Sequence, residues 1–151
     1  MNVVDIMTHN PITVMADQPI VKALAMMASH GCKHLPVLSR SHHLVGVISD
    51  RDIRYALESP FTQEEDWKQH QTAHHIKIST VMTAAPIIVE PQAPAEHAAE
   101  LMLSHSIGCL PVMRAETLVG IITRSDILMA FISIQQRAAA RNNGSPLRDS
   151  E

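Results

Sequence analysis

The feature that most constrains this chain of 151 residues is an internal duplication. Residues 3–57 reappear, after one deletion, as residues 78–131, so that Met7 aligns with Met82 and Leu44-Val45-Gly46 with Leu118-Val119-Gly120. Two copies are too few to form an open solenoid, in which several stacked units share one continuous core. The duplication therefore predicts two small subdomains related by a pseudo-twofold axis, with a crevice between them.

Each copy has the pattern β-α-β-β-α, which predicts the α/β (α+β) class, each repeat being a small sheet packed on two helices. In the first copy we expect a strand at 11–14, a helix from Pro19 to Gly31, strands at 35–38 and 44–49, and a helix from Asp50. In the second copy we expect strands at 86–89, 110–113 and 118–123, and helices that begin at Pro94 and at Arg124. The final helices are expected to face inward through Ile53, Ala56 and Leu57 and through Ile127, Leu128, Phe131, Ile134 and Ala138.

The composition of the chain divides it into four segments. Residues 1–57 form the first repeat, residues 58–77 a polar linker, and residues 78–134 the second repeat. Residues 135–151 are expected to be a helix extension followed by a frayed tail, because Asn, Gly, Ser and Pro gather after Ala138.

Charge and hydropathy exclude several classes of function. A net charge of -3 and the lack of a Lys or Arg block give no basic surface for nucleic acid. No apolar run approaches the roughly 18 residues of a membrane span, and the N-terminus lacks a signal-peptide pattern, so a cytoplasmic protein is expected. Cys32 and Cys109 occupy non-equivalent places in the repeats and are expected to be reduced thiols rather than a disulfide or metal pair.

The chemistry-bearing position of each repeat is the corner where its last strand turns into its last helix. These corners read Ser49-Asp50-Arg51-Asp52 and Thr123-Arg124-Ser125-Asp126. The free N–H groups of a first helical turn can receive an anion, and a carboxylate there can accept the hydroxyls of a ribose. The same spacing also forms a capping box, in which the hydroxyl and the carboxylate only close the helix end. Spacing alone does not separate the two interpretations.

The motifs of both repeats resemble the cystathionine-beta-synthase (CBS) domain, and the pair resembles a Bateman module. The resemblance rests on three motifs, of which the first two are Met-Thr-x-x-Pro-Ile-x-Val and Leu-Pro-Val. The third is Leu-Val-Gly-h-Ile-[Ser/Thr]-x-x-Asp-Ile, where h is an apolar residue. The run Ile107-Gly108-Cys109-Leu110-Pro111-Val112 is similar to CBS-pair proteins of the acetoin-utilization AcuB type.

The resemblance implies a regulatory, non-enzymatic module that senses an adenine nucleotide (AMP, ADP or ATP) in the crevice and passes the state to an unknown effector protein. No covalent cofactor and no metal are implied. It places one site, site A, at Ser49, Arg51, Asp52, Met82, Ile87, Gly108 and Cys109. The other, site B, would lie at Thr123, Arg124, Asp126, Met7, Ile12, Lys33 and His34. It also implies a homodimer, for which Met26, Met27, Met129 and residues 127–134 are candidate contacts.

The two candidate sites have diverged in charge. Lys33 and His34 offer positive charge or donors, whereas their counterparts Gly108 and Cys109 are small and neutral. Arg124 likewise replaces Asp50. Unequal affinity is therefore expected, with polyphosphate preferring the Asp126 site.

The sequence is also compatible with two other functions. One is a structural dimerising subunit with decayed sites, and the other is a metal sensor based on the ten histidines, of which His70, His74 and His75 have local metal-ligand spacing. His30 and His105 occupy equivalent positions near a helix end, where a structural role is expected. An enzyme is disfavoured because no P-loop, nucleophile elbow or His-Glu-x-x-His motif occurs.

Overall fold

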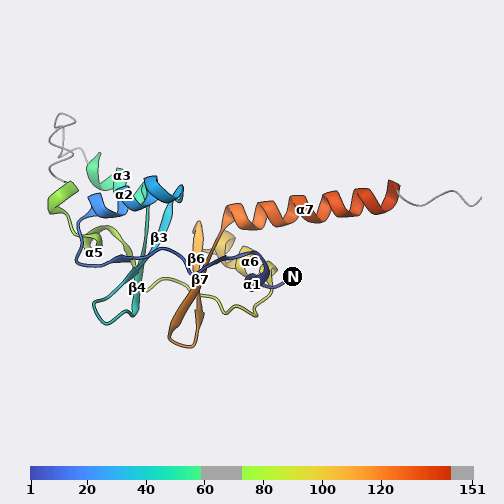
Figure 1. Cartoon of the computed structure of the whole chain (residues 1–151), viewed down its shortest axis with the longest axis horizontal. Helices are drawn as coiled ribbons and strands as arrows, with labels where there is room; N and C mark the ends of the chain where they lie inside the picture. Colours follow the sequence, from blue (N-terminus) through green and yellow to red (C-terminus); the bar gives the residue numbers. More distant parts are fainter. Residues whose placement is uncertain (59–72, 144–151) are drawn as a thin grey trace, which may run out of the picture.

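The computed structural model describes residues 1–58 and 73–143 (Figure 1). The N-terminal part contains α1 (Val3–Ile6), β1 (Thr8–His9), β2 (Val14–Met15), α2 (Ile20–His30), β3 (His34–Leu38), β4 (Leu44–Ser49) and α3 (Asp50–Leu57). The C-terminal part contains α5 (Ile78–Val81), β5 (Thr83–Ala84), α6 (Ala95–Ser104), β6 (Cys109–Arg114), β7 (Thr117–Thr123) and α7 (Arg124–Asn143). His70 and residues 144–151, on which part of the linker and tail expectations depend, lie outside the described residues.

The strands form two sheets, one per repeat. The N-terminal arm of each repeat, α1 with β1 in the first and α5 with β5 in the second, packs on the other repeat, so the arms are exchanged. The first sheet has the order β2-β3-β4-β5 and the second the order β1-β7-β6. Thus β1 pairs with β7 of the second repeat, with Thr8 opposite Ile121, and β5 pairs with β4 of the first, with Thr83 opposite Val47. The predicted class, with two pseudo-twofold related repeats, is confirmed, and the exchange of arms is an addition to it.

The first predicted strand of each repeat is shorter than expected. In the first copy only Val14 and Met15 pair, in parallel, with β3, and in the second copy the pairing is reduced to a single bridge between Val89 and Val112. The preceding residues carry the chain from one repeat to the other. Each crossing begins with a prolyl residue, which lacks an N–H, directly after a residue with left-handed backbone (Asn10, φ 46°; Ala85, φ 46°).

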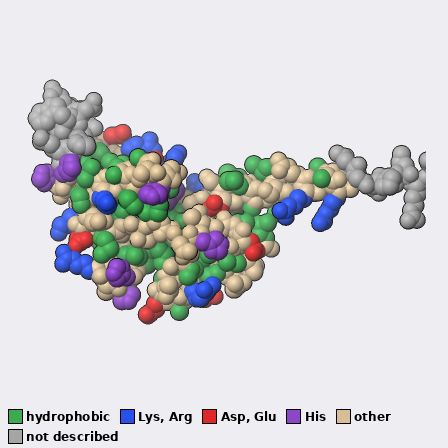
Figure 2. All heavy atoms as spheres, viewed as in Figure 1, with side chains coloured by type: hydrophobic (Ala, Val, Ile, Leu, Met, Phe, Trp, Pro, Cys, Tyr) green, Lys and Arg blue, Asp and Glu red, His purple; other side chains and the backbone are tan. Residues whose placement is uncertain are grey.

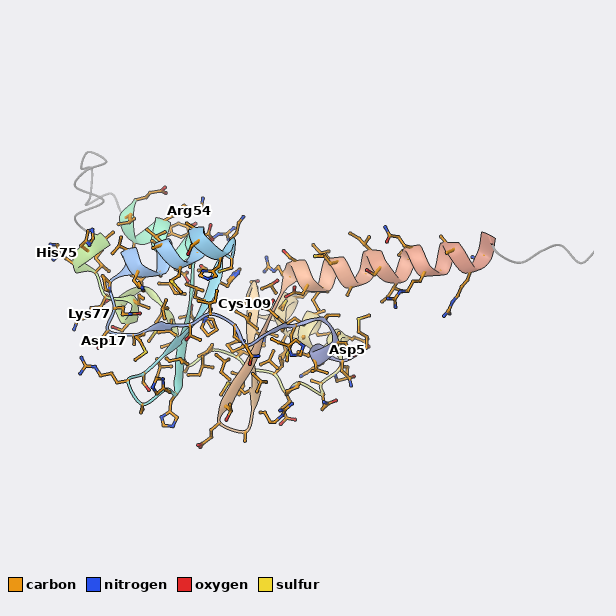
Figure 3. All side chains as sticks on the ribbon, in the orientation of Figure 1. Asp5, Asp17, Arg54, His75, Lys77 and Cys109 are labelled. Carbon is orange, nitrogen blue, oxygen red and sulfur yellow. The ribbon has the colours of Figure 1, made fainter. Side chains whose placement is uncertain are left out.

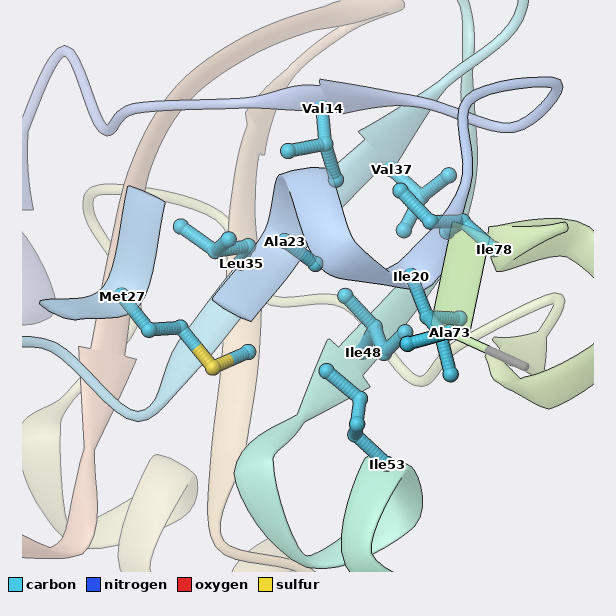
Figure 4. Packing of buried hydrophobic residues seen from close by; sticks show 10 residues of the cluster. All are labelled: Val14, Ile20, Ala23, Met27, Leu35, Val37, Ile48, Ile53, Ala73 and Ile78. Carbon is cyan, nitrogen blue, oxygen red and sulfur yellow. The ribbon is translucent and has the colours of Figure 1, made fainter. Parts of the chain in front are cut away.

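The exchanged arms complete the two hydrophobic cores. The core of the first repeat contains Ile20, Leu35, Ile48 and Ile53 and is closed by Ile78 from the second arm (Figure 4). The core of the second repeat contains Leu110, Val112 and Ile122 and is closed by Val3 and Met7 from the first arm. Burial of such a side chain contributes roughly 1.5–3 kcal/mol. Each repeat therefore depends on a segment that precedes the other.

The helix ends follow the sequence signals. Gly31 adopts the left-handed conformation (φ 63°) that ends α2, and its N–H donates to the Met27 carbonyl. The equivalent imidazoles His30 and His105 each place Nδ1 3.1 Å from the carbonyl oxygen four residues earlier. Both rings lie against the last turn of their helix, as expected of histidines with a structural role.

Helix α7 differs from the expectation for its exposed face. It runs to Asn143 and projects from the body of the molecule (Figure 1), so residues after Ala138 are helical as far as they are described. Ile53 and Ile127 pack inward as predicted, but Leu128, Phe131 and Ile134 are 62%, 58% and 47% exposed, and Ala138 is also exposed. The prediction that this apolar stripe faces inward is therefore wrong beyond Ile127, because α7 extends away from the sheet that would cover it. Among the described residues, no helix has the length and apolar content to cross a membrane.

Candidate functional site

The two strand-to-helix corners lie at the same end of the molecule. In Figure 1 both β-hairpins turn at the lower end, and α3 and α7 begin at the opposite end, beside the junction of the two sheets. The sheets meet there through Val47, Cys109 and Ile121, which are 8%, 8% and 6% exposed and form a buried cluster between the repeats. Cys109 is labelled at this junction in Figure 3. The fold therefore brings the two predicted corners to opposite sides of one contact.

The corner of the first repeat is a complete capping box. The Asp52 backbone N–H donates to Ser49 Oγ at 3.1 Å, and the Ser49 N–H donates to Asp52 Oδ2 at 2.9 Å. Both side chains are half-buried. Asp50 next to them is held in an ion pair with Arg54 (3.2 Å). The corner thus carries one carboxylate engaged in the cap and another partly neutralised by an arginine.

The corner of the second repeat repeats this geometry with one additional bond. The Thr123 N–H donates to Asp126 Oδ2 at 2.8 Å, and the Thr123 hydroxyl donates to the same oxygen at 3.0 Å. The Asp126 N–H lies 3.4 Å from Thr123 Oγ1. In place of the Asp50 carboxylate stands Arg124, whose Nε–H donates to the Ile107 carbonyl at 3.1 Å.

Each corner carboxylate has one oxygen atom that takes no part in the cap. The described capping bonds use Oδ2 of Asp52 and Oδ2 of Asp126, and within residues 1–58 and 73–143 no partner is recorded for Oδ1 of either side chain. A carboxylate offers about four acceptor positions. The capping and ligand interpretations are therefore compatible, since one oxygen closes the helix and the other can accept an external hydroxyl.

The residues that precede β3 and β6 lie against the corner of their own repeat. The Asp50 N–H donates to the Lys33 carbonyl at 3.0 Å, and the Arg124 N–H donates to the Gly108 carbonyl at 3.1 Å. In the ladders, His34 pairs with Ser49 and Cys109 pairs with Thr123. These pairings join each corner to the start of the neighbouring strand in its own repeat. The predicted sites A and B instead combine each corner with the start of the equivalent strand in the other repeat.

Some residues of the predicted sets nevertheless meet between the two repeats. A Cβ built on Gly108 would lie 3.0 Å from His34 Nε2, so the imidazole of one repeat covers the backbone of the other. The negative charge of Asp52 acts on Cys109, and the positive charge of Arg124 acts on His34. Residues of the two predicted sets therefore lie near one another where the two repeats face each other.

The remaining predicted residues occupy different environments. Met82 is half-buried and precedes Thr83, which pairs with β4, whereas Met7 is 8% exposed and lies in the core of the second repeat. Ile12 and Ile87 pack partly against the cores of their own repeats. Arg51 is exposed. The structure thus places Met82 against Gly46 in β4 and leaves Met7 little surface for a ligand.

Burial changes the acidity of two groups at the centre. Burial, reinforced by the Asp52 charge, raises the pKa of the Cys109 thiol to about 12, so the thiol is neutral at physiological pH. Burial also lowers the pKa of His34, against the opposing effect of Asp50 and Asp52, and the positive charges of Arg124 and Lys33 lower it further. The contact between the repeats therefore contains an imidazole whose neutral form is favoured by burial.

Sequence reasoning missed two features of this region. One is the contact of His34 with Gly108, which the absence of a side chain at Gly108 could have suggested. The other is a hollow of about 520 Å³ at the hairpin end, which includes none of the predicted site residues. Its lining comes from both repeats and contains Asn10, Pro11, Thr13, Leu38, Ser41, His42, His43, Glu116, Thr117 and Leu118. Within the described residues, no group of three His, Cys, Asp or Glu side chains is placed to hold a metal ion.

Comparison with known proteins identifies the family of this architecture. The model of the CBS domain matches the chain twice, at residues 3–59 and 78–133. The chain therefore belongs to the CBS domain family and contains two CBS domains in tandem.

Solved structures of this family resemble the whole pair. A putative acetoin utilization protein (AcuB) from Vibrio cholerae is 30% identical, with a TM-score of 0.74 over 97% of this chain and 98% of that one. CBSX2, a CBS-pair protein from Arabidopsis thaliana, solved in complex with AMP, is 30% identical (TM-score 0.70; 89% and 98% covered). The CBS domain pair of protein MJ0100, solved with 5′-methylthioadenosine and S-adenosyl-L-methionine, is 29% identical (TM-score 0.74; 88% and 97% covered).

Proposed function

We propose that this CBS pair is a regulatory module that binds an adenosine-containing nucleotide of the AMP, ADP or ATP class in the crevice between its repeats. The observation that carries the proposal is the pair of corner carboxylates. Each is fixed at a helix N-terminus by its Oδ2, while its Oδ1 is left open to a ribose hydroxyl. Support comes from CBSX2, which was solved with AMP, and from MJ0100, which was solved with two adenosine derivatives.

The signal would be a population shift of the two repeats. A ligand that binds between them favours the arrangement in which both corners contact it, and it shifts the equilibrium by its difference in affinity for the open and closed arrangements. A partner protein that contacts both repeats would detect this change. Modules of this kind are regulatory. The effector protein would therefore have a contact surface that spans the two repeats.

Thermal unfolding with a panel of ligands tests the proposal. AMP, ADP, ATP, S-adenosylmethionine, NAD and zinc are added separately, and a ligand at about 100 times its dissociation constant should stabilise the protein by about 2.7 kcal/mol. We expect at least one adenine nucleotide to raise the midpoint by several degrees. The increase should disappear in Asp126→Asn, which keeps a capping acceptor but removes the charge that holds the ribose.

Asp5→Asn is the matched control. Asp5 accepts the same type of capping bond, from the Asn2 N–H at 2.7 Å, but it lies on α1 outside both predicted site sets. It should leave the ligand shift unchanged. The absence of a shift with every nucleotide would instead favour a structural subunit, and a shift with zinc alone would favour a metal sensor.

We further propose that the module forms a homodimer through the apolar face of α7, which consists of Leu128, Met129, Phe131, Ile132 and Ile134. These side chains are 47–67% exposed, and Figure 2 shows hydrophobic side chains along α7 where it leaves the body of the molecule. An exposed group of large apolar side chains is typical of a protein–protein contact. The equivalents of Leu128 and Met129 in the first repeat are Arg54 and Tyr55. The apolar face is thus confined to one helix, and a twofold axis would place it against its own copy.

One expected dimer contact is corrected by the structure. Met27 is 6% exposed and belongs to the core of the first repeat, because it lies on the inner face of α2. Phe131→Glu should convert the dimer to a monomer in sedimentation or light-scattering measurements, whereas Arg137→Glu, one turn beyond the apolar face, should not. A wild-type protein that sediments as a monomer would refute the dimer.

A further inference from the structure

His34 is a half-buried imidazole that contacts the backbone of the other repeat. Its ring lies over Gly108, where an added Cβ would come within 3.0 Å of Nε2. The equivalent side chain of the second repeat is the thiol of Cys109, which is 8% exposed and packs with Val47 and Ile121. A ligand that binds between the repeats beside Gly108 would therefore have to move the imidazole.

The charges around His34 differ on its two sides. Its own repeat contributes Asp50 and Asp52 from the start of α3 and Lys33 from the preceding residue, and the other repeat contributes Arg124 from the start of α7. Cys109, beside Gly108, contributes no charge at neutral pH because its thiol pKa is raised to about 12. The carboxylates and the two cations shift the pKa of His34 in opposite directions, and burial, the largest effect, favours the neutral imidazole.

Like Lys33, Arg124 forms no ion pair with a carboxylate among the described residues. It donates only to the Ile107 carbonyl, and the two ion pairs found among the described residues join Arg40 to Asp17 and Arg54 to Asp50. A guanidinium has five N–H donors, so one bond to a carbonyl leaves other donors available to a phosphate. A phosphate beside Arg124 would also bring negative charge toward His34 and favour its protonation.

We propose that His34 is a proton-coupled gate: its imidazole leaves Gly108 and takes up a proton when an adenosine ligand places a phosphate beside Arg124. The gate makes the site prefer phosphorylated adenosine ligands over uncharged or cationic ones. This inference rests on the proposed nucleotide function and adds the ligand class and its pH dependence.

Calorimetric titration with AMP and with adenosine tests the gate, because the two ligands differ only in the phosphate. From about pH 7.5 to about pH 6, the ratio of AMP affinity to adenosine affinity should rise about threefold to tenfold more in the wild type than in His34→Gln. The AMP binding heat should depend on the ionisation enthalpy of the buffer, which reveals proton uptake. The phosphate itself titrates near pH 6, so His34→Gln supplies the reference for that contribution.

His97→Gln, an exposed substitution on α6, is the control and should behave as the wild type. Should His34→Gln fail to fold, NMR titration of the imidazoles in the unmodified protein gives the same information: AMP should raise the pKa of His34 and leave the ring resonances of His97 in place. AMP binding with a pH dependence equal to that of His34→Gln, or with no change in the His34 titration, would overturn the gate and leave the nucleotide site standing. A wild type that binds neither AMP nor adenosine would overturn both.

Discussion

At the scale of single residues, Cys109 shows how the repeat interface controls reactivity. Its thiol is buried in the cluster with Val47 and Ile121, and its pKa is raised to about 12 by burial and by the Asp52 charge. The thiolate is the reactive form, and at about pH 8 it would make up only about one part in 10⁴ of this cysteine. Cys32 is half-buried, and burial also raises the pKa of its thiol.

We therefore expect a disulfide reagent to label Cys32 faster than Cys109 in the native protein and both equally after unfolding. Labelling rates of Cys32→Ser and Cys109→Ser give the comparison. Because the folded-state pKa of Cys109 lies above its ordinary value of 9.0, its contribution to the free energy of unfolding is complete below about pH 9 and is lost as the pH rises toward 12. Equal labelling rates in the native state would contradict the burial of this thiol.

Ala85 and Asn10 are equivalent residues with the same left-handed backbone (φ 46°) at the crossings between repeats. Alanine tolerates this conformation poorly, whereas asparagine tolerates it better. Ala85→Gly should raise the free energy of unfolding by about 0.5–1 kcal/mol in urea denaturation. Asn10→Gly is the matched control and should give a smaller gain. A larger gain for Asn10→Gly would refute this explanation.

At the scale of elements, the exchanged arms lie so close to the central strands that only glycine fits beneath them. A Cβ on Gly120 would lie 3.0 Å from the Thr8 carbonyl oxygen and also meet the Met7 side chain. A Cβ on Gly46 would lie 2.9 Å from the Thr83 carbonyl oxygen and meet Met82. The glycine of each Leu-Val-Gly motif is thus explained by the arm that crosses from the other repeat.

Gly120→Ala should therefore lower the free energy of unfolding by about 1–3 kcal/mol, because a backbone oxygen cannot move aside as a flexible side chain can. Gly46→Ala should cost a similar amount. Thr117→Ala, an exposed change on the same strand as Gly120, serves as the control and should stay within about 0.5 kcal/mol of the wild type. A Gly120→Ala protein as stable as this control would show that the arm is loosely held.

At the scale of the whole molecule, the exchange of arms joins the two repeats into one folding unit. Ile78 is fully buried in the core of the first repeat although it begins the second, and Val3 is fully buried in the core of the second. Neither repeat can keep its core when the other unfolds. The pair should therefore unfold in one cooperative transition.

Ile78→Ala should lower the free energy of unfolding by about 2–5 kcal/mol and move the whole calorimetric peak rather than split it. Ser79→Ala, at the exposed neighbouring position, should leave the peak in place. Two separate peaks in either protein would contradict a single cooperative unit.

The sequence by itself determined the duplication, the pattern of helices and strands, the glycine end of α2 and the two capping corners. These features depend on local signals: hydrophobic periodicity, cap residues and turn residues within a few positions of one another. It also indicated that Asp52 and Asp126 belong to equivalent positions, since both lie in the same repeated motif.

Only the tertiary structure decided what depends on contacts distant in sequence. The pairing of β1 with β7 and of β5 with β4, the placement of His34 over Gly108, and the exposure of Leu128 and Phe131 are examples. A periodic apolar stripe shows that a helix has a face to cover, but it does not say whether the cover is the same chain or another one. Likewise, a corner motif fixes the geometry of its own cap, whereas the residues opposite it are set by how the two repeats pack.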